Sequence, residues 1–170
     1  AISFVASSTI VIVPFMMFLA FTFSTISYFL VNLPPALDIF LFSTFTVFMI
    51  LMTGFCFSQM VSVIAPDPMA GQVVGVAVLS IMFLCSGFFS PKAEIPIEWV
   101  WVYYVSVFHW GFGSLMVNGL SDTSFDGLSS QEVLAEYGLS GVSKWNGVCM
   151  LLLFIVLFRC VFYYFLTTRF

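Results

Sequence analysis

Long apolar runs separated by short polar or proline-rich breaks dominate this chain. A transmembrane helix needs about 20 apolar residues to cross the bilayer core, which is about 30 Å thick. Runs of that length predict four membrane spans, at residues 8–31, 39–64, 69–89 and 145–166. Pro34 and Pro35 follow the first run, and Pro66 and Pro68 follow the second. Proline removes a backbone donor and fixes φ, so these breaks end the predicted helices.

Residues 95–117 are as long as a span but differ from the four runs in composition. They are rich in Trp, Tyr and Phe, include Glu98, and are interrupted by His109, Gly111 and Gly113. Trp and Tyr gather at the membrane–water interface, where one end of the ring is apolar and the other is wet. The pattern predicts a helix–turn–helix that lies in the outer leaflet or re-enters it, and a fifth full span is the alternative.

Residues 119–143 are the one stretch with the composition of a soluble loop. Ser129 and Glu132 fit the S-x-x-E pattern of a helix start, and Gly138 suits the position just after a helix end. A short helix at about 130–137 is therefore predicted inside this loop.

Composition places most of the chain in lipid. Of its 170 residues 62% are hydrophobic and only 7% are charged, whereas soluble proteins carry about 25% charged residues. The predicted fold is an all-α polytopic membrane bundle, with four transmembrane helices and an interfacial re-entrant helix pair. A formal net charge of −4 offers no basic patch for nucleic acid. The pattern does not distinguish the plasma membrane from an internal membrane.

The chain offers little catalytic or metal-binding chemistry. It has one histidine and no G-x-x-x-x-G-K-[ST] motif, so it cannot bind ATP through a P-loop. Its four cysteines all lie in apolar runs without metal-ligand spacing, and we interpret them as buried small hydrophobic residues. The prediction is a chain that is not itself an enzyme and holds neither metal nor cofactor.

Small residues recur at four-residue spacing in two of the spans. They are Gly54, Ser58 and Ser62 in the second, and Gly71 and Gly75 in the third. Small residues at this spacing let helices approach closely. They predict helix packing within the bundle, and a subunit interface is the alternative.

Three polar residues within the apolar segments are interpreted as structural. We expect Gln59 to hydrogen-bond to a neighbouring helix rather than to a substrate. The stem of Arg159 can extend toward the end of its span, where the charge anchors the helix. His109, between two aromatic residues, is expected to be a satisfied interfacial side chain rather than a metal ligand.

One face of the third span is a candidate cavity wall. Val76, Ser80 and Phe83 fall on one helical face, which ends at Phe88 and Phe89. Such a face could line an apolar cavity closed by the two rings, although this pattern is more often core packing.

An ordered series of landmarks resembles one family. The landmarks are Ser27-Tyr28-Phe29, Leu33-Pro34-Pro35, Ser86-Gly87-Phe88-Phe89, Ile95-Pro96, Trp101, Tyr104-Val105-Ser106, Gly111-Phe112, Asn118, Tyr137-Gly138, Trp145-Asn146 and Phe158-Arg159. Their order and spacing are similar to the C-terminal two-thirds of the ABC-2 type membrane domain in ABC transporters of the G subfamily. These are the white, sterol and multidrug half-transporters, and the resemblance covers essentially all of residues 1–170.

The resemblance implies a set of roles. The four spans become the third to sixth helices of six, residues 95–117 the re-entrant pair and residues 119–143 the extracellular loop. The turn at Pro66–Pro68 then faces the cytosol. Val76, Ser80 and Phe83 fall on family cavity positions, and Phe88 and Phe89 take the place of the leucines that usually close the extracellular side.

The resemblance also implies partners and cofactors. ATP and Mg belong to a nucleotide-binding domain, a second membrane domain completes a homo- or heterodimer, and the cargo is lipophilic (lipid, sterol or drug). Because the chain starts at Ala1 rather than Met, we expect a fragment. The resemblance implies that the fragment lacks this domain and the first two helices. Asn118-Gly119-Leu120 departs from the family's Asn-Glu-Phe. A non-transporting tetraspan scaffold is the alternative function.

Overall fold

The structure, a computed structural model, describes residues 2–31, 36–87, 97–120, 134, 139 and 143–169. These residues are almost all helical and contain no strand. The helices are α1 (Ile2–Val31), α2 (Leu37–Ile64), α3 (Pro68–Leu84), η2 (Ile97–Trp99), α4 (Val100–Val105), α5 (Val107–Leu120) and α7 (Lys144–Arg169). The predicted all-α polytopic membrane bundle is confirmed.

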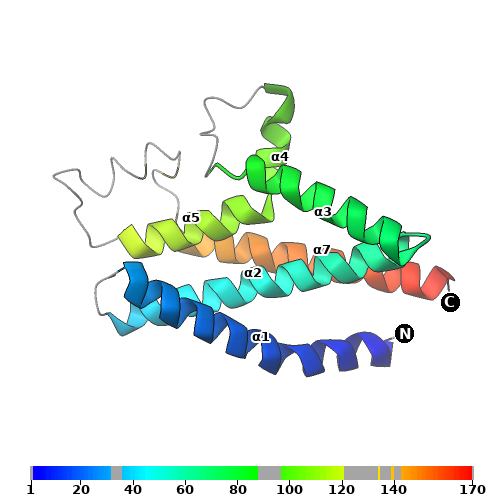
Figure 1. Cartoon of the computed structure of the whole chain (residues 1–170), viewed down its shortest axis with the longest axis horizontal. Coiled ribbons are helices and arrows are strands. Elements are labelled where there is room, and N and C mark those ends of the chain that lie inside the picture. Colours follow the sequence, from blue (N-terminus) through cyan, green and yellow to red (C-terminus); the bar gives the residue numbers. More distant parts are fainter. Residues whose placement is uncertain are drawn as a thin grey trace.

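Helix α2 is the centre of the bundle. It contacts α7, α1, α5 and α3. In Figure 1, α2 and α7 run in the same direction, α5 runs against them, and α1 and α3 lie on opposite sides of this layer. The N- and C-termini lie at the same end as the turn between α2 and α3. The central core comprises Met49, Cys56, Phe57, Val107, Leu151, Phe154 and Phe158.

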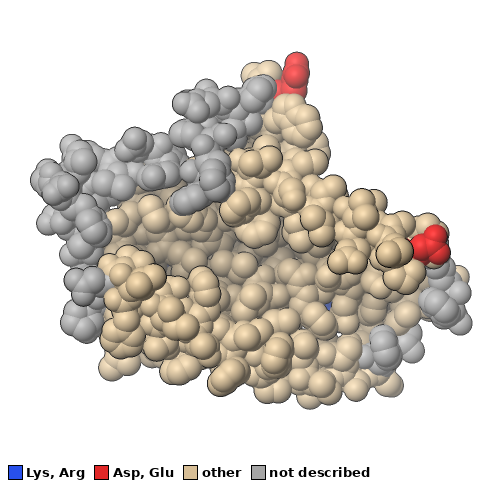
Figure 2. Space-filling view, in the orientation of Figure 1, with Lys and Arg blue, Asp and Glu red and all other residues tan. Residues whose placement is uncertain are grey.

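Three helices are long and apolar enough to cross a membrane. They are Val5–Val31 within α1, Leu37–Ile64, and Lys144–Thr168 within α7. Figure 2 shows a face that is almost uncharged over the described residues, with acidic side chains only at two points on its margin. An apolar exterior of this kind suits lipid as the surrounding solvent.

Helix α3 differs from the span predicted at 69–89. It ends at Leu84 after 17 residues, which is about 26 Å at 1.5 Å per residue. Gly87 then takes a φ of 89°, a conformation that glycine adopts without the strain of a Cβ. The chain therefore turns out of the helix before position 88, and residues 88 and 89 lie outside the described residues.

The predicted helix–turn–helix is present, but its break lies elsewhere. Helices Ile97–Val105 and Val107–Leu120 meet at an angle of 69°, with extended backbone at Ser106 between them. Gly111 and Gly113, which the sequence suggests as interruptions, lie inside α5. By length and composition the pair is either a broken span or a re-entrant loop. Most of 119–143, including the short helix predicted at 130–137, lies outside the described residues.

The threonine hydroxyl groups inside the described helices are satisfied locally, whereas the buried Ser24 Oγ has no hydrogen-bond partner among the described residues. The threonines at 22, 25, 44, 46, 53, 167 and 168 each donate to the carbonyl oxygen four residues earlier, at 2.7–2.9 Å. The hydrocarbon core of a bilayer holds no water that could hydrogen-bond to an unpaired polar group, so this local bond lets threonine occur in a membrane helix.

Candidate functional site

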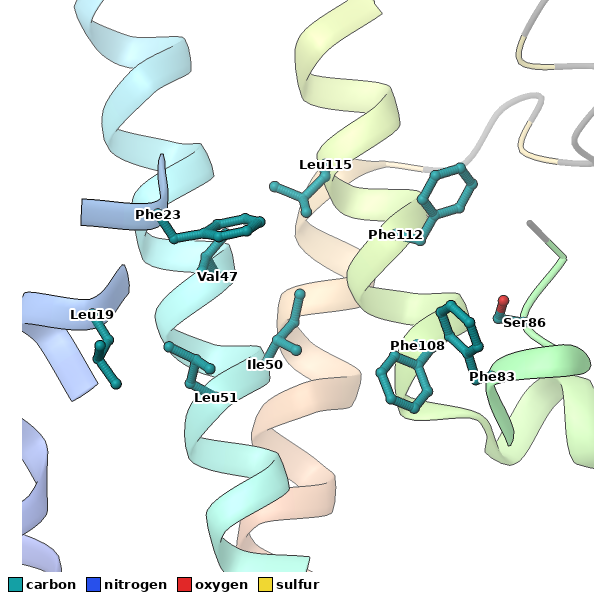
Figure 3. Close-up of a pocket in the computed structure, with 10 residues that line it drawn as sticks. All are labelled: Leu19, Phe23, Val47, Ile50, Leu51, Phe83, Ser86, Phe108, Phe112 and Leu115. Atoms are coloured by element: carbon teal, nitrogen blue, oxygen red, sulfur yellow. The ribbon is translucent and has the colours of Figure 1, made fainter. Parts of the chain in front are cut away.

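An apolar pocket of about 590 Å³ opens between α1, α2, α3 and α5. Figure 3 shows side chains from all four helices pointing into it. The lining consists of Leu19, Phe23, Val47, Ile50, Leu51, Phe83, Ser86, Phe108, Phe112 and Leu115. Nearly all of this surface is carbon, and Ser86 contributes the one hydroxyl side chain. The pocket therefore suits an apolar ligand or an apolar part of one.

The structure brings one of the three predicted cavity residues to this pocket. Phe83 lies in the wall, with its ring edge-on to Phe108 at a centroid distance of 5.3 Å. Val76 lines a separate groove with Gly71 and Gly75, and Ser80 is exposed, its hydroxyl donating to the Val76 carbonyl at 2.8 Å. The pocket contacts only the C-terminal end of α3. The helical face shared by Val76, Ser80 and Phe83 continues past the pocket toward the start of the helix.

Hydrogen bonds connect the bend between α4 and α5 to the end of α3. The Ser106 hydroxyl donates to the Met82 carbonyl at 2.7 Å and accepts from the His109 N–H at 3.4 Å. His109 is buried, and its Nδ1 lies 3.2 Å from the Ser86 carbonyl oxygen. His109 is thus a satisfied structural side chain, as predicted. These bonds fix the backbone directly before residues 88 and 89, the predicted extracellular gate.

Two glycines that the sequence pattern did not single out for packing hold α5 close to its neighbours. A Cβ on Gly147 of α7 would overlap the Trp110 carbonyl oxygen and the Ser114 Oγ of α5. A Cβ on Gly111 would lie 2.6 Å from Cδ1 of Ile50 on α2. Neither glycine belongs to a four-residue repeat of glycine or serine within its helix, so spacing gave no signal for them.

The predicted packing glycines have different surroundings. A Cβ on Gly71 would lie 2.9 Å from the Ala65 Cβ, and one on Gly75 would lie 3.7 Å from a Val61 methyl. Both therefore face the end of α2. A Cβ on Gly54 would meet nothing within 4 Å, so Gly54 does not mediate packing within the described part of the chain. Ser58 and Ser62 line grooves beside α2.

Asn118, which the sequence marks only as a landmark, ties α2, α5 and α7 together. It is fully buried, and its Nδ2 donates to the Ile39 carbonyl at 2.9 Å and to the Ser43 Oγ at 3.1 Å. The Lys144 Nζ donates to the Asn118 Oδ1 at 3.1 Å and lies 4.9 Å from the centre of the Phe42 ring. We call Asn118, Ser43 and Lys144 the polar node.

A second polar contact joins α2 and α7 near the opposite end. The Arg159 Nη1 donates to the Gln59 Oε1 at 2.7 Å, which confirms that Gln59 bonds to a neighbouring helix. The guanidinium carbon lies 5.5 Å from the centre of the Phe55 ring. Arg159 thus bonds inside the bundle, whereas the sequence suggests that its side chain extends to the helix end.

Comparison with known proteins gives a consistent result. The family model for the ABC-2 type transporter matches residues 1–120. The chain is 31% identical over 166 residues to ABC transporter G family member 23 of Arabidopsis thaliana, covering 92% of this chain and 27% of that protein. It is 31% identical over 179 residues to member 5 of the same plant, covering 98% and 27%. With ABC transporter G family member STR of Petunia hybrida it shares 31% over 118 residues, covering 69% and 14%. The chain spans about a quarter of the length of the first two relatives.

Proposed function

The chain belongs to the ABC-2 type transporter family, as the membrane part of an ABC transporter of the G family, and on this basis we propose that the whole protein exports lipophilic substrates. The observation that carries the proposal is the apolar pocket of about 590 Å³. Ligand pockets for small molecules commonly have about 300–1,000 Å³ and apolar linings with few polar groups. A lipid, a sterol or an apolar drug fits this chemistry.

Transport requires an energy source and a second membrane domain. In this proposal ATP and Mg bind to a nucleotide-binding domain outside this chain, and two membrane domains face each other around the cargo. The relatives are ABC transporters, and α1 leaves much of its apolar surface uncovered, with Leu30 83% exposed. That surface can be covered by lipid, by further helices or by the second membrane domain.

Filling the pocket tests its role as part of the cargo site. Leu51→Trp adds ring volume to the pocket wall without adding charge, so we expect a loss of cargo transport and of cargo-stimulated ATPase activity of about tenfold. Leu152→Trp is the matched control, because Leu152 is 48% exposed on α7 and is not among the pocket-lining residues. Equal transport by both variants would remove the pocket from the cargo path.

The gate proposal concerns Phe88 and Phe89. Its support is the family resemblance, together with the position of Ser86, which lines the pocket two residues earlier. Replacing both rings by alanine removes the closing surface, so we expect raised basal ATPase activity and altered efflux in the full-length protein. Unchanged basal ATPase activity and efflux in the Phe88→Ala, Phe89→Ala variant would contradict the gate.

A further inference from the structure

A second groove, mostly apolar but with three polar side chains in its lining, lies between α2 and α7 at the end of the bundle that carries the α2–α3 turn. It has a volume of about 670 Å³, and its walls include Ser58, Gln59 and Ser62 of α2 and Phe162 of α7. It shares no lining residue with the apolar pocket. Three polar side chains in a groove of a helix pair surrounded by lipid need a separate explanation.

Arg159 is connected to this groove through Gln59, and it is not itself among the residues that line the groove. A guanidinium has five N–H donors, and the structure shows Nη1 bonded to Gln59, whose side chain also lines the groove. The Arg159 Nη2 is buried and has no hydrogen-bond partner within the described part of the chain. Because an unsatisfied buried donor is unfavourable, a ligand that supplies an acceptor gains by binding there.

The groove walls add donors and no opposing charge. Ser58 and Ser62 are exposed on the groove walls, whereas Thr46 and Thr53 of the same helix turn their hydroxyls back to the helix. Among the described residues no carboxylate lines the groove. Asp67, in the adjacent turn, is exposed. The groove therefore favours an anionic ligand over a cation.

The groove is placed to receive a lipid headgroup. Ser62 lies two residues before α2 ends at Ile64, and the groove continues to Pro66 and Pro68 in the turn. It therefore reaches from membrane depth to the bilayer surface on the side that the family resemblance assigns to the cytosol. Basic pockets between transmembrane helices on this side suit anionic headgroups, and arginine matches the geometry of phosphate.

We propose that this groove binds the phosphate of a phospholipid from the adjacent leaflet, with Arg159 as the cation and Ser58 and Ser62 as hydroxyl donors. A shift of the Gln59 side chain exposes the guanidinium to the entering phosphate. The acyl chains remain in the surrounding lipid. The site is separate from the proposed cargo pocket, so the test of this proposal does not depend on which substrate the protein exports.

Native mass spectrometry of the purified full-length protein tests this site. The probes are dioleoyl phosphatidylserine, dioleoylglycerol with the same acyl chains but no phosphate, and glycerol 3-phosphate with the phosphate but no chains. We expect Arg159→Met to bind phosphatidylserine about tenfold more weakly than the unmodified protein. The Ser58→Ala, Ser62→Ala variant should bind it about threefold more weakly. Thr22→Ala should bind it normally, since this hydroxyl donates to the Phe18 carbonyl on α1 and lines neither the groove nor the apolar pocket.

Three results would overturn the proposal. They are equal phosphatidylserine binding by Arg159→Met and the unmodified protein, binding of dioleoylglycerol as tight as that of phosphatidylserine, and displacement of phosphatidylserine by an equal concentration of glycerol 3-phosphate. The last result would assign the site to a free phosphate compound. If Arg159→Met does not fold, Arg159→Lys and the double serine variant decide, and normal binding by both would overturn the site.

Discussion

Replacing Gly147 by leucine is expected to prevent the bundle from assembling. Gly147 is a point of close approach between α7 and α5, and even a single Cβ there would overlap the Trp110 carbonyl oxygen and the Ser114 Oγ. A backbone carbonyl inside a helix cannot move aside as the end of a flexible side chain can. Overpacking of a close contact destabilises by about 1–3 kcal/mol and sometimes more, and leucine exceeds the available space by a whole side chain. We expect little folded full-length protein by gel filtration in detergent.

Gly147→Ala and Gly54→Ala form a matched pair that isolates the cause. Gly147→Ala should lower the free energy of unfolding by about 1–3 kcal/mol. Gly54→Ala should raise it by about 0.5–1 kcal/mol, because alanine favours a helix and its Cβ would meet nothing within 4 Å. Thermal unfolding in detergent measures both. Equal shifts in the two variants would mean that helix propensity, and not the α5–α7 contact, governs the response.

The sequence predicts the three long membrane helices well, because a long apolar run indicates that the surrounding solvent is lipid, but it overestimates the length of α3. It also indicates the Gln59 contact, because an amide at membrane depth needs a partner. Spacing alone could not identify Gly147, since its importance comes from the Trp110 carbonyl of a helix more than 30 residues away in the chain. The same limit applies to Asn118, which looks like any polar residue near a helix end.

The bend between α4 and α5 shows a second limit. Gly111 and Gly113 suggested breaks, because glycine weakens helices in isolation. In the bundle they stay helical and bring α5 close to its neighbours, with Gly111 against Ile50. The actual break falls at Ser106, whose hydroxyl bonds to the Met82 carbonyl of α3. Tertiary contacts therefore decide which of the candidate breakers ends the helix.

The polar node should respond to mutation as a unit. Asn118→Leu keeps a similar volume but removes the bonds to Ile39 and Ser43 and leaves the Lys144 ammonium without its Oδ1 acceptor. Bonds to charged groups contribute about 1.5–3 kcal/mol each, and unsatisfied buried groups add to the loss. We expect the free energy of unfolding to fall by about 2–4 kcal/mol, measured by thermal or denaturant unfolding of the full-length protein.

A double-mutant cycle separates the node from general damage to packing. Lys144→Met alone removes one donor to Asn118 and is expected to lower stability by about 1 kcal/mol. The Asn118→Leu, Lys144→Met double variant has no ammonium group that lacks an acceptor. Its loss in free energy of unfolding should therefore be smaller than the sum of the two single losses by about 1 kcal/mol or more. Asn118→Leu combined with Ser80→Ala should be additive, because the Ser80 hydroxyl bonds locally on α3. Additivity in both cycles would mean that Asn118 and Lys144 act separately, and that buried volume rather than the hydrogen bond joins α5 to α7 at this end.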